Sequence, residues 1–378
     1  MKVSDGNNRE WLHDVENRLL FELYIAYLQA RAGGKRGTFD EHKFEVNEFE
    51  NLINLRDSLI DKTYRPSRGT AHVIFKPVIR EIFAASFRDR VVHHFIYNTV
   101  CDWWDRHFIY DSYSCRENKG TDFGIKRLSR MLQSVTDNYK KEAWVIKLDV
   151  QGYFMSLPRK QLYRRAIWGL DRQFENNHNW KYELVKFLWA QTIFDDPCAG
   201  VRKKGWPEDW KDLPASKSLF TQLPGVGIVI GNLTSQLLSN IYLDQLDRYI
   251  KYELGWKYYG RYVDDFFIIV TEEQLPRALE DVKRIEAFLG RLGLTLHPNK
   301  RKVQPARNGV EFLGAVVYPG RVHPGKRIVK NAGMAFSEVV EGVKDVESVV
   351  SYMGHMKHYN TQMLMTKLFD KAGWDYRS

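Results

Sequence analysis

The chain has 378 residues, 44% of them hydrophobic and 14% aromatic, and carries a formal net charge of +10 at pH 7. This composition excludes a disordered protein and supports two or three domains with buried cores. The positive charge favours a polyanionic partner such as nucleic acid, because basic surfaces bind phosphate backbones with release of counterions. The sequence has no apolar run near the ~18–20 residues of a transmembrane helix and no signal-peptide core at its start, so we expect a cytoplasmic protein.

The first hundred residues predict helices on either side of a β-hairpin. Apolar residues recur at helical spacing over 11–30 and 47–60, and again over 87–104. Between the last two helices lie the strand-like runs 71–75 and 79–84, which carry Lys76 at their junction and Arg80. Without further evidence, these two cations are side chains on a surface hairpin.

A further predicted strand, after the two of the hairpin, ends on an acidic residue. A helix over 124–133 leads to the apolar run Trp144-Val-Ile-Lys-Leu-Asp149, and Phe154 follows five residues after Asp149. Residues 176–220 then form a long segment that contains four tryptophans and the basic patch 202–204. Aromatic residues mixed with cations suit nucleic-acid contact, but they also suit an insertion packed by its tryptophans.

The acidic pair Asp264-Asp265 lies between two apolar, aromatic runs, 256–261 and 266–270. This pattern predicts an antiparallel hairpin with both carboxylates at its tip, although aspartate is also common in ordinary turns. Asp149 is another acidic residue at the end of a predicted strand. Carboxylates on adjacent strands are the oxygen ligands that hold two Mg²⁺ ions roughly 3.5–4 Å apart in phosphoryl transfer. The remaining residues predict a helix over 272–292, a hairpin over 309–317 and a tail of helices over 334–343, 346–358 and 361–372.

The run Tyr262-Val-Asp-Asp265 in a hydrophobic hairpin, about a hundred residues after a strand ending in Asp149, resembles the palm of reverse transcriptases. The resemblance implies an α+β right-hand polymerase fold with fingers, a palm of antiparallel sheet plus helices, and a short helical thumb. Its expected parts are an N-terminal helical extension (1–63), fingers (64–142), palm (143–318, with an insertion at about 176–220) and thumb (319–378).

The same resemblance assigns roles to individual residues. Mg²⁺, as two ions, would be held by Asp149, Asp264 and Asp265 with the backbone carbonyl of Val150. Deoxynucleoside triphosphate would be bound by Lys76 and Arg80, by Phe154 under the sugar and by Lys300 near the pyrophosphate. A lysine in a solvated turn is the simpler interpretation of Lys300, and a core aromatic that of Phe154. Arg116, in Tyr113-Ser-Cys-Arg116, would lie along the template or the nucleotide.

One motif departs from the usual pattern. Most bacterial reverse transcriptases carry Gln-Gly, three residues and Ser-Pro, whereas this chain has Ile230-Gly231, three residues and Ser235-Gln236. The departure resembles the reverse transcriptases of diversity-generating retroelements, within the group II intron- and retron-like bacterial enzymes. It makes Ile230 and Gln236 candidate fidelity or template contacts. An aliphatic side chain in place of a Gln amide offers shape without directional hydrogen bonds, which weakens discrimination.

The subclass implies cDNA synthesis with errors at template adenines, called mutagenic retrohoming. It also implies a bacterial or phage-encoded protein whose partners are a template RNA, the RNA–DNA hybrid and a small basic helical accessory protein. Two alternatives stay open. One is a retron- or phage-defence-type reverse transcriptase, against which Ile230 and Ser235-Gln236 argue. The other is a non-catalytic RNA-binding scaffold, against which the intact aspartates argue.

Overall fold

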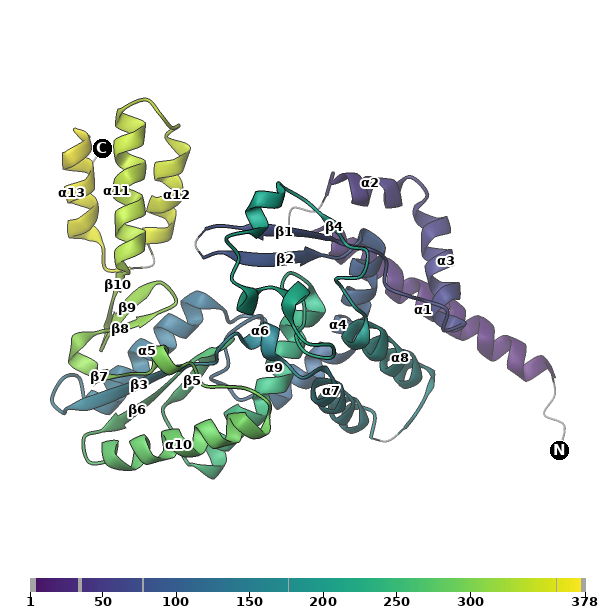
Figure 1. The fold of residues 1–378 in the computed structure, drawn as a ribbon, viewed down its shortest axis with the longest axis horizontal. Helices are drawn as coiled ribbons and strands as arrows, with labels where there is room; N and C mark the ends of the chain where they lie inside the picture. Colours follow the sequence, from purple (N-terminus) through teal and green to yellow (C-terminus); the bar gives the residue numbers. More distant parts are fainter. Residues whose placement is uncertain (1–4, 33–35, 77, 176, 358, 375–378) are drawn as a thin grey trace. The chain divides into compact units, whose positions relative to one another are not determined.

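The structure is a computed structural model, which describes residues 5–32, 36–76, 78–175, 177–357 and 359–374 (Figure 1). Its contacts divide the chain into two compact units. Unit 1 comprises Met1–Ile109, Gln151–Gln245 and Leu289–Leu294, and unit 2 comprises Tyr110–Val150, Leu246–Phe288 and Thr295–Ser378. Among the described residues, no helix has the length and apolar character needed to cross a membrane.

Unit 2 is built on a four-stranded antiparallel sheet with the strand order β5-β6-β3-β7. Its strands are β3 (Ala143–Asp149), β5 (Tyr259–Tyr262), β6 (Asp265–Thr271) and β7 (Lys302–Pro305). The apolar centre of β6 is buried along its length, which explains why the sequence there is continuously hydrophobic. The predicted hairpin and the predicted strand ending at Asp149 are both confirmed, and the two strands are direct neighbours.

One face of this sheet packs against α5 (Thr121–Thr136) and a second, three-stranded sheet. That sheet consists of β8 (Val310–Phe312), β9 (Ala315–Tyr318) and β10 (Arg321–Pro324) in antiparallel order. The shared core includes Leu128 and Leu132 of α5 with Phe267 of β6 and Phe312 of β8. The hairpin expected over 309–317 is therefore confirmed, and β10 extends it by one strand. The helix α10 (Leu275–Arg291) follows β6, as expected from its strong amphipathic pattern.

The chain after β10 forms three helices, α11 (Lys326–Val340), α12 (Glu347–Met356) and α13 (Gln362–Ala372). They share a small core of Ala332, Phe336, Val349, Met356 and Met365. Three helices were expected here, but the first begins at Lys326 rather than Met334. The predicted start of this helix was about two helical turns too late. Pro324-Gly325 ends the preceding strand, so the helix can begin directly after it. His358, the expected end of the second helix, lies outside the described residues.

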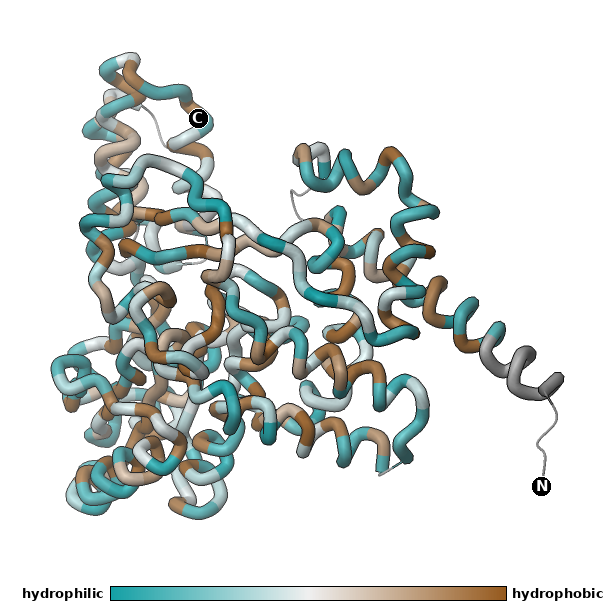
Figure 2. The backbone as a smooth tube through the Cα atoms, turned by 45° about the vertical axis from the view of Figure 1, so that its right-hand side comes forward, coloured by the Kyte–Doolittle hydropathy of each residue, from teal (hydrophilic) through white to brown (hydrophobic). Residues whose placement is uncertain are grey.

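Unit 1 contains the N-terminal helices and the first β-hairpin. The helices α1 (Asp5–Arg31), α3 (Glu48–Ile60) and α4 (Phe87–His107) and the strands β1 (Thr70–Ile74) and β2 (Arg80–Ala84) confirm the predicted elements. A further helix, α2 (Phe39–Glu45), was not predicted, because seven residues are too few for a periodic signal. The unit also holds α6 (Tyr153–Ser156), α7 (Arg159–Gln173), α8 (Trp180–Phe194) and most of α9 (Leu233–Arg248). Figure 2 shows apolar and polar residues interleaved along the helices, as expected for amphipathic elements.

The long segment over 176–220 belongs to unit 1. It includes α8 and the short strand β4 (Arg202–Lys203), which pairs in parallel with β1. Trp189 of α8 is fully buried, and the Lys203 ammonium lies 4.5 Å from the ring centre of Trp210. Trp189 therefore packs in the core of unit 1, while Trp206 is 76% exposed, and the insertion expected here stays a prediction.

Candidate active site

The tight turn between β5 and β6 holds Val263 and Asp264, with Tyr262 opposite Asp265 in register. Val263 has φ of +55°, a left-handed conformation that a β-branched residue rarely adopts. Hydrogen bonds from outside the turn hold it there. The Val263 amide donates to Ser114 Oγ at 3.2 Å, and its carbonyl accepts from Arg261 Nη1 at 2.9 Å.

Main-chain pairing brings three carboxylates to one end of the sheet. Asp149 is the residue directly opposite Asp265, so their Cβ atoms are neighbours across the β3–β6 ladder. The amide of Val150 donates to the Asp264 carbonyl at 3.1 Å, and the amide of His297 donates to the Asp149 carbonyl at 2.7 Å. Strand pairing and the turn thus place Asp149, Asp264 and Asp265 at one end of the sheet, and the roles predicted for them stay predictions.

Burial raises the pKa of Asp264 to about 6, and the nearby Asp149 carboxylate adds to the shift. Burial also raises the pKa of Asp265 to about 6, although Lys147 opposes that change. Like charges that are close and partly desolvated disfavour ionisation in this way. The cluster therefore needs a positive charge near it at neutral pH.

Two lysines supply positive charge in this structure. Lys147 Nζ lies 2.9 Å from Asp265 Oδ2, and Lys300 Nζ donates to both Asp149 oxygens at 2.9 Å. Asp265 Oδ1 is buried and has no hydrogen-bond partner among the described residues. Within the same residues, no group of three or more His, Cys, Asp or Glu side chains has the arrangement of a metal site. A buried carboxylate oxygen without a partner, beside two more carboxylates, nevertheless fits a hard cation.

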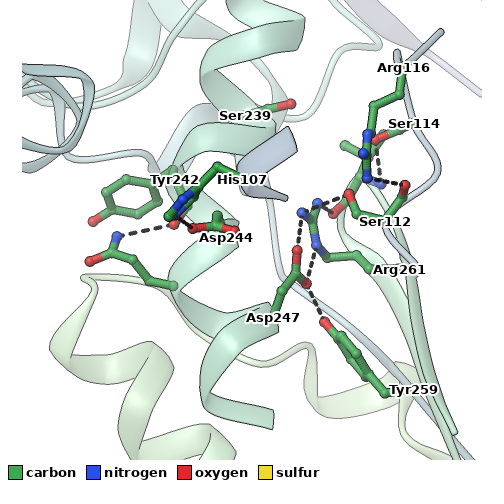
Figure 3. A network of polar contacts seen from close by, with 12 residues as sticks. His107, Ser112, Ser114, Arg116, Ser239, Tyr242, Asp244, Asp247, Tyr259 and Arg261 are labelled. Atoms are coloured by element: carbon green, nitrogen blue, oxygen red, sulfur yellow. Dashed lines mark hydrogen bonds and ion pairs between the residues drawn. The ribbon is translucent and has the colours of Figure 1, made fainter. Parts of the chain in front are cut away.

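A buried ion pair supports the turn from behind (Figure 3). Arg261 and Asp247 are both fully buried, and Arg261 donates from Nε and Nη2 to the two Asp247 oxygens at 2.7 and 2.6 Å. Tyr259 also donates to Asp247, at 2.6 Å, and burial beside that carboxylate raises the pKa of Tyr259 well above its usual value. This pair was not predicted from the sequence. The available signal was a charged residue inside the apolar strand, three positions before Asp264.

Arg116 also belongs to unit 2. Its guanidinium donates to the Ser112 carbonyl at 3.1 Å, in the segment whose Ser114 holds the turn. The structure therefore places this predicted site residue next to residues that position Asp264.

The remaining predicted site residues all fall in unit 1. Lys76 and Arg80 are exposed on the β1–β2 hairpin, and Gln236 is exposed on α9. Phe154 is half-buried in α6, while its neighbour Tyr153 is buried and donates to the Ser239 carbonyl. Tyr153 is therefore the core aromatic of the two.

Within unit 1, backbone hydrogen bonds connect the loop 227–232 to the residues around it. The Ile228 amide donates to the Phe154 carbonyl and the Phe83 amide to the Ile230 carbonyl, both at 2.8 Å. Gly231 has φ of +126°, and a Cβ at that position would lie 2.4 Å from the Phe83 carbonyl oxygen. Only glycine allows this close approach, so the Ile230 backbone is held against the end of β2.

A buried glutamate, which the sequence analysis did not single out, joins the same hairpin to the segment before this loop. Glu81 is fully buried and accepts hydrogen bonds from Ser218 Oγ at 2.8 Å and the Leu219 amide at 2.7 Å. Burial raises the pKa of Glu81, and these two hydrogen bonds oppose the shift.

Carboxylates at the tip of an antiparallel hairpin and at the end of its neighbouring strand, in a basic chain, are compatible with a metal-dependent enzyme that acts on nucleic acid. The family model described as reverse transcriptase (RNA-dependent DNA polymerase) matches residues 76–317, more than half of the chain. The chain belongs to this family of RNA-directed DNA polymerases. The α+β right-hand fold and the enzyme class that we expected are thereby confirmed, and reverse transcriptase domains generally use divalent metal ions.

Two further similarities accompany the family match. Protein YkfC of Escherichia coli (strain K12) is 25% identical over 298 residues, which cover 69% of this chain and 69% of that protein. A solved structure of telomerase from Candida tropicalis, in complex with a fragment of telomeric RNA, gives a TM-score of 0.49 at 12% sequence identity. The similarity covers 87% of this chain and 60% of the telomerase chain.

The buried pair behind the turn predicts an unequal effect of two arginine substitutions. Arg261→Met leaves the Asp247 carboxylate buried without its partner and should lower the free energy of unfolding by about 3–5 kcal/mol. The matched control is Arg307→Met, whose partner Glu142 is 49% exposed, with an expected loss below about 1 kcal/mol. Urea unfolding of the metal-free protein measures the free energy of unfolding of both variants. Equal losses would contradict the expected difference between the buried pair and the exposed pair.

The raised pKa values of Asp264 and Asp265 predict how the stability of the metal-free protein depends on pH. Their folded-state pKa values, about 6, exceed the usual value of 3.8, so folding is disfavoured as pH rises from about 4 through 6. Asp264→Asn should therefore stabilise the metal-free protein at pH 7.5 by about 2 kcal/mol and leave it unchanged near pH 3.5. Thermal unfolding in EDTA across this range tests the sign. A loss of stability at pH 7.5 would contradict it.

Proposed function

We propose that the chain makes cDNA from a retroelement template RNA by two-metal-ion nucleotidyl transfer, with reduced fidelity at template adenines. The observation that carries the mechanism is the cluster of Asp149, Asp264 and Asp265, set by strand pairing at one end of the unit 2 sheet. The proposed subclass rests instead on Ile230 and on Ser235-Gln236.

In this proposal Asp149 and Asp264 hold Mg²⁺, with the Val150 carbonyl and Asp265 completing the oxygen ligands. When bound, the two ions activate the attacking 3′-hydroxyl and neutralise charge on the leaving pyrophosphate. Two observations support these assignments: the raised pKa values of Asp264 and Asp265, and the unpartnered Asp265 Oδ1. Bound cations would compensate the repulsion that raises those pKa values.

The two lysines at the cluster take different roles. Lys147 is anchored in β3 and orients Asp265, because its ammonium lies within hydrogen-bond distance of Oδ2. The Lys300 side chain is 56% exposed and long, so it can move from Asp149 to the leaving pyrophosphate. There it would donate a hydrogen bond or a proton.

Unit 1 supplies the contacts that select the nucleotide. Lys76 is a point charge and Arg80 a bidentate donor for the triphosphate. Phe154 excludes a 2′-hydroxyl by packing under the sugar, and the hydrogen bond from Ile228 to its carbonyl supports a fixed position. Arg116 of unit 2 is assigned to the template or the nucleotide.

Ile230 and Gln236 set fidelity in this proposal. An isoleucine offers no directional hydrogen bond to an incoming nucleotide, so a mispair leaves no polar group unpaired and is rejected less strongly. The proposed partners are the template RNA, the RNA–DNA hybrid, deoxynucleoside triphosphates and a small basic helical accessory protein. The exposed lysines 357, 367 and 371 of the C-terminal helices are suited to the hybrid backbone, which is recognised by shape and phosphate.

The first test is primer extension on an RNA template with and without Mg²⁺. We expect extension that EDTA abolishes and that Asp264→Asn lowers by at least about 10³-fold, because one metal ligand is lost. The control is Asp137→Asn, at a surface turn of unit 2, which should extend normally. Metal-independent extension, or full activity of Asp264→Asn, would contradict the two-metal assignment.

The second test is the error spectrum of the products, sorted by template base. We expect errors concentrated at template adenines, and Ile230→Gln should lower them by about tenfold because the amide restores directional contacts. Leu223→Gln, at an apolar residue that is 77% exposed in the same unit, is the matched control and should change nothing. Evenly spread errors in the wild type would favour the retron or phage-defence alternative.

A further inference from the structure

The N-terminal helices of unit 1 expose apolar side chains on the side opposite their core. On α1 the buried positions include Leu19, Leu23 and Ala26, which recur at helical spacing. The opposite face carries three exposed apolar residues and α3 adds two more, and we call these five the N-terminal apolar patch: Phe21 (65% exposed), Ile25, Leu28, Phe49 (68%) and Ile53.

The residues of the patch belong to one surface. Tyr24 lies one helical turn from Phe21 and from Leu28, and its ring stacks on Phe49 with centroids 6.4 Å apart and planes 7° from parallel. The aromatic contact therefore joins the exposed face of α1 to that of α3. Figure 1 shows the two helices side by side. Large exposed apolar surfaces of this kind mark interaction sites rather than ordinary solvent-facing helices.

The charge of this region is opposite to that of the whole chain. Residues 13–61 carry ten acidic and six basic side chains, although the chain has a net charge of +10. Exposed acids flank the patch, among them Asp14 (70% exposed), Asp57 (49%) and Glu50. Arg18 and Arg56 pair with Asp14 and Asp57 and offset their charge, so the net negative charge of the region comes from its other acids.

This combination decides between classes of partner. Nucleic acid and anionic membranes are both repelled by acidic side chains, and nucleic acid has no need of five exposed apolar residues. A second copy that presented the same patch would bring two acidic rims together. A protein whose apolar contact residues are bordered by lysine and arginine matches both the patch and its rim.

We propose that the N-terminal apolar patch binds a basic amphipathic helix of a partner protein. The apolar side of that helix packs on Phe21, Tyr24 and Phe49, as in other helix-in-groove complexes. Its cations lie near Glu50 and share Asp14 and Asp57 with Arg18 and Arg56. The accessory protein of the proposed function is the candidate partner, and this identification rests on that proposal. The exposure and the charge of the patch are observations that do not depend on the proposed function.

The test uses a designed peptide as the probe. A fluorescein-labelled amphipathic helix of about 18 residues, made of leucine and lysine, is titrated with the full chain and followed by anisotropy. A leucine–glutamate helix of the same pattern is the charge control. We expect the basic peptide to bind at least about tenfold more tightly than the acidic one. Equal affinities would overturn the proposal.

Matched variants assign the binding to the patch. Phe21→Ser with Phe49→Ser should weaken binding of the basic peptide by at least about tenfold. Val340→Ser with Val343→Ser removes two exposed apolar residues (53% and 68% exposed) from unit 2 and should change nothing. Both pairs lie at exposed positions, and circular dichroism melting checks that each variant folds. Unchanged affinity in the Phe21/Phe49 variant would overturn the proposal.

Two further measurements separate this inference from its rivals. Primer extension on an RNA template, without peptide, should be the same for the Phe21/Phe49 variant and the wild type. Peptide binding without extension would refute the proposed function alone, whereas extension without binding would refute the docking site alone. Sedimentation of the full chain tests self-association. A dimer that the Phe21/Phe49 substitutions dissociate would make the patch a contact between copies and overturn the proposal.

Discussion

The close approach of three carboxylates at one end of an apolar sheet is the constraint on which unit 2 depends. Asp149 and Asp265 face each other across paired strands, and Asp264 lies in the turn beside them. Burial disfavours the charged state of Asp264 and Asp265, so the arrangement is unfavourable unless positive charge is near. Lys147 and Lys300 provide that charge in the structure. A polymerase exploits the same repulsion, because carboxylates that are destabilised together bind cations tightly.

Such a cluster persists only if its backbone is rigid. The turn contains a valine in a left-handed conformation, which costs of order 1 kcal/mol or more. Arg261 and Asp247 hold it through a buried ion pair, and Arg261 donates to the strained residue itself. Buried ion pairs contribute little net stability compared with apolar packing, but they allow few alternative geometries. We interpret this pair as a device that positions Asp264 rather than one that stabilises the fold.

The two units divide the predicted chemistry. Unit 2 holds the acidic residues, Lys300 and Arg116, whereas unit 1 holds Lys76, Arg80, Phe154 and Ile230. In unit 1 the loop that carries Ile230 is bonded to the end of β2 and, through Ile228, to Phe154. These backbone hydrogen bonds do not involve the Ile230 side chain, so we expect a substitution at Ile230 to leave them in place.

Local sequence determined much of this protein. Strand and helix periodicity, the acidic pair at a tight turn and the strand ending at Asp149 were sufficient to predict the main helices and the strands that carry the carboxylates, and the resemblance of Tyr262-Val-Asp-Asp265 to a known motif supplied the α+β class and the reverse transcriptase family. These features are local because hydrophobic periodicity and turn chemistry act over a few residues. The roles of individual residues such as Lys76 and Phe154 stay predictions.

Tertiary structure alone decided the partnerships between distant residues. No pattern in the sequence pairs Arg261 with Asp247, Lys147 with Asp265 or Glu81 with Ser218, since each pair forms only after separate segments pack and lose water. It also decided which apolar residues remain outside the core. Helical spacing places Leu23 on the core face of α1, but the exposure of the large apolar Phe21 follows only from how the neighbouring elements pack. Burial and desolvation are properties of the whole fold, which is why they cannot be assigned from a single stretch of sequence.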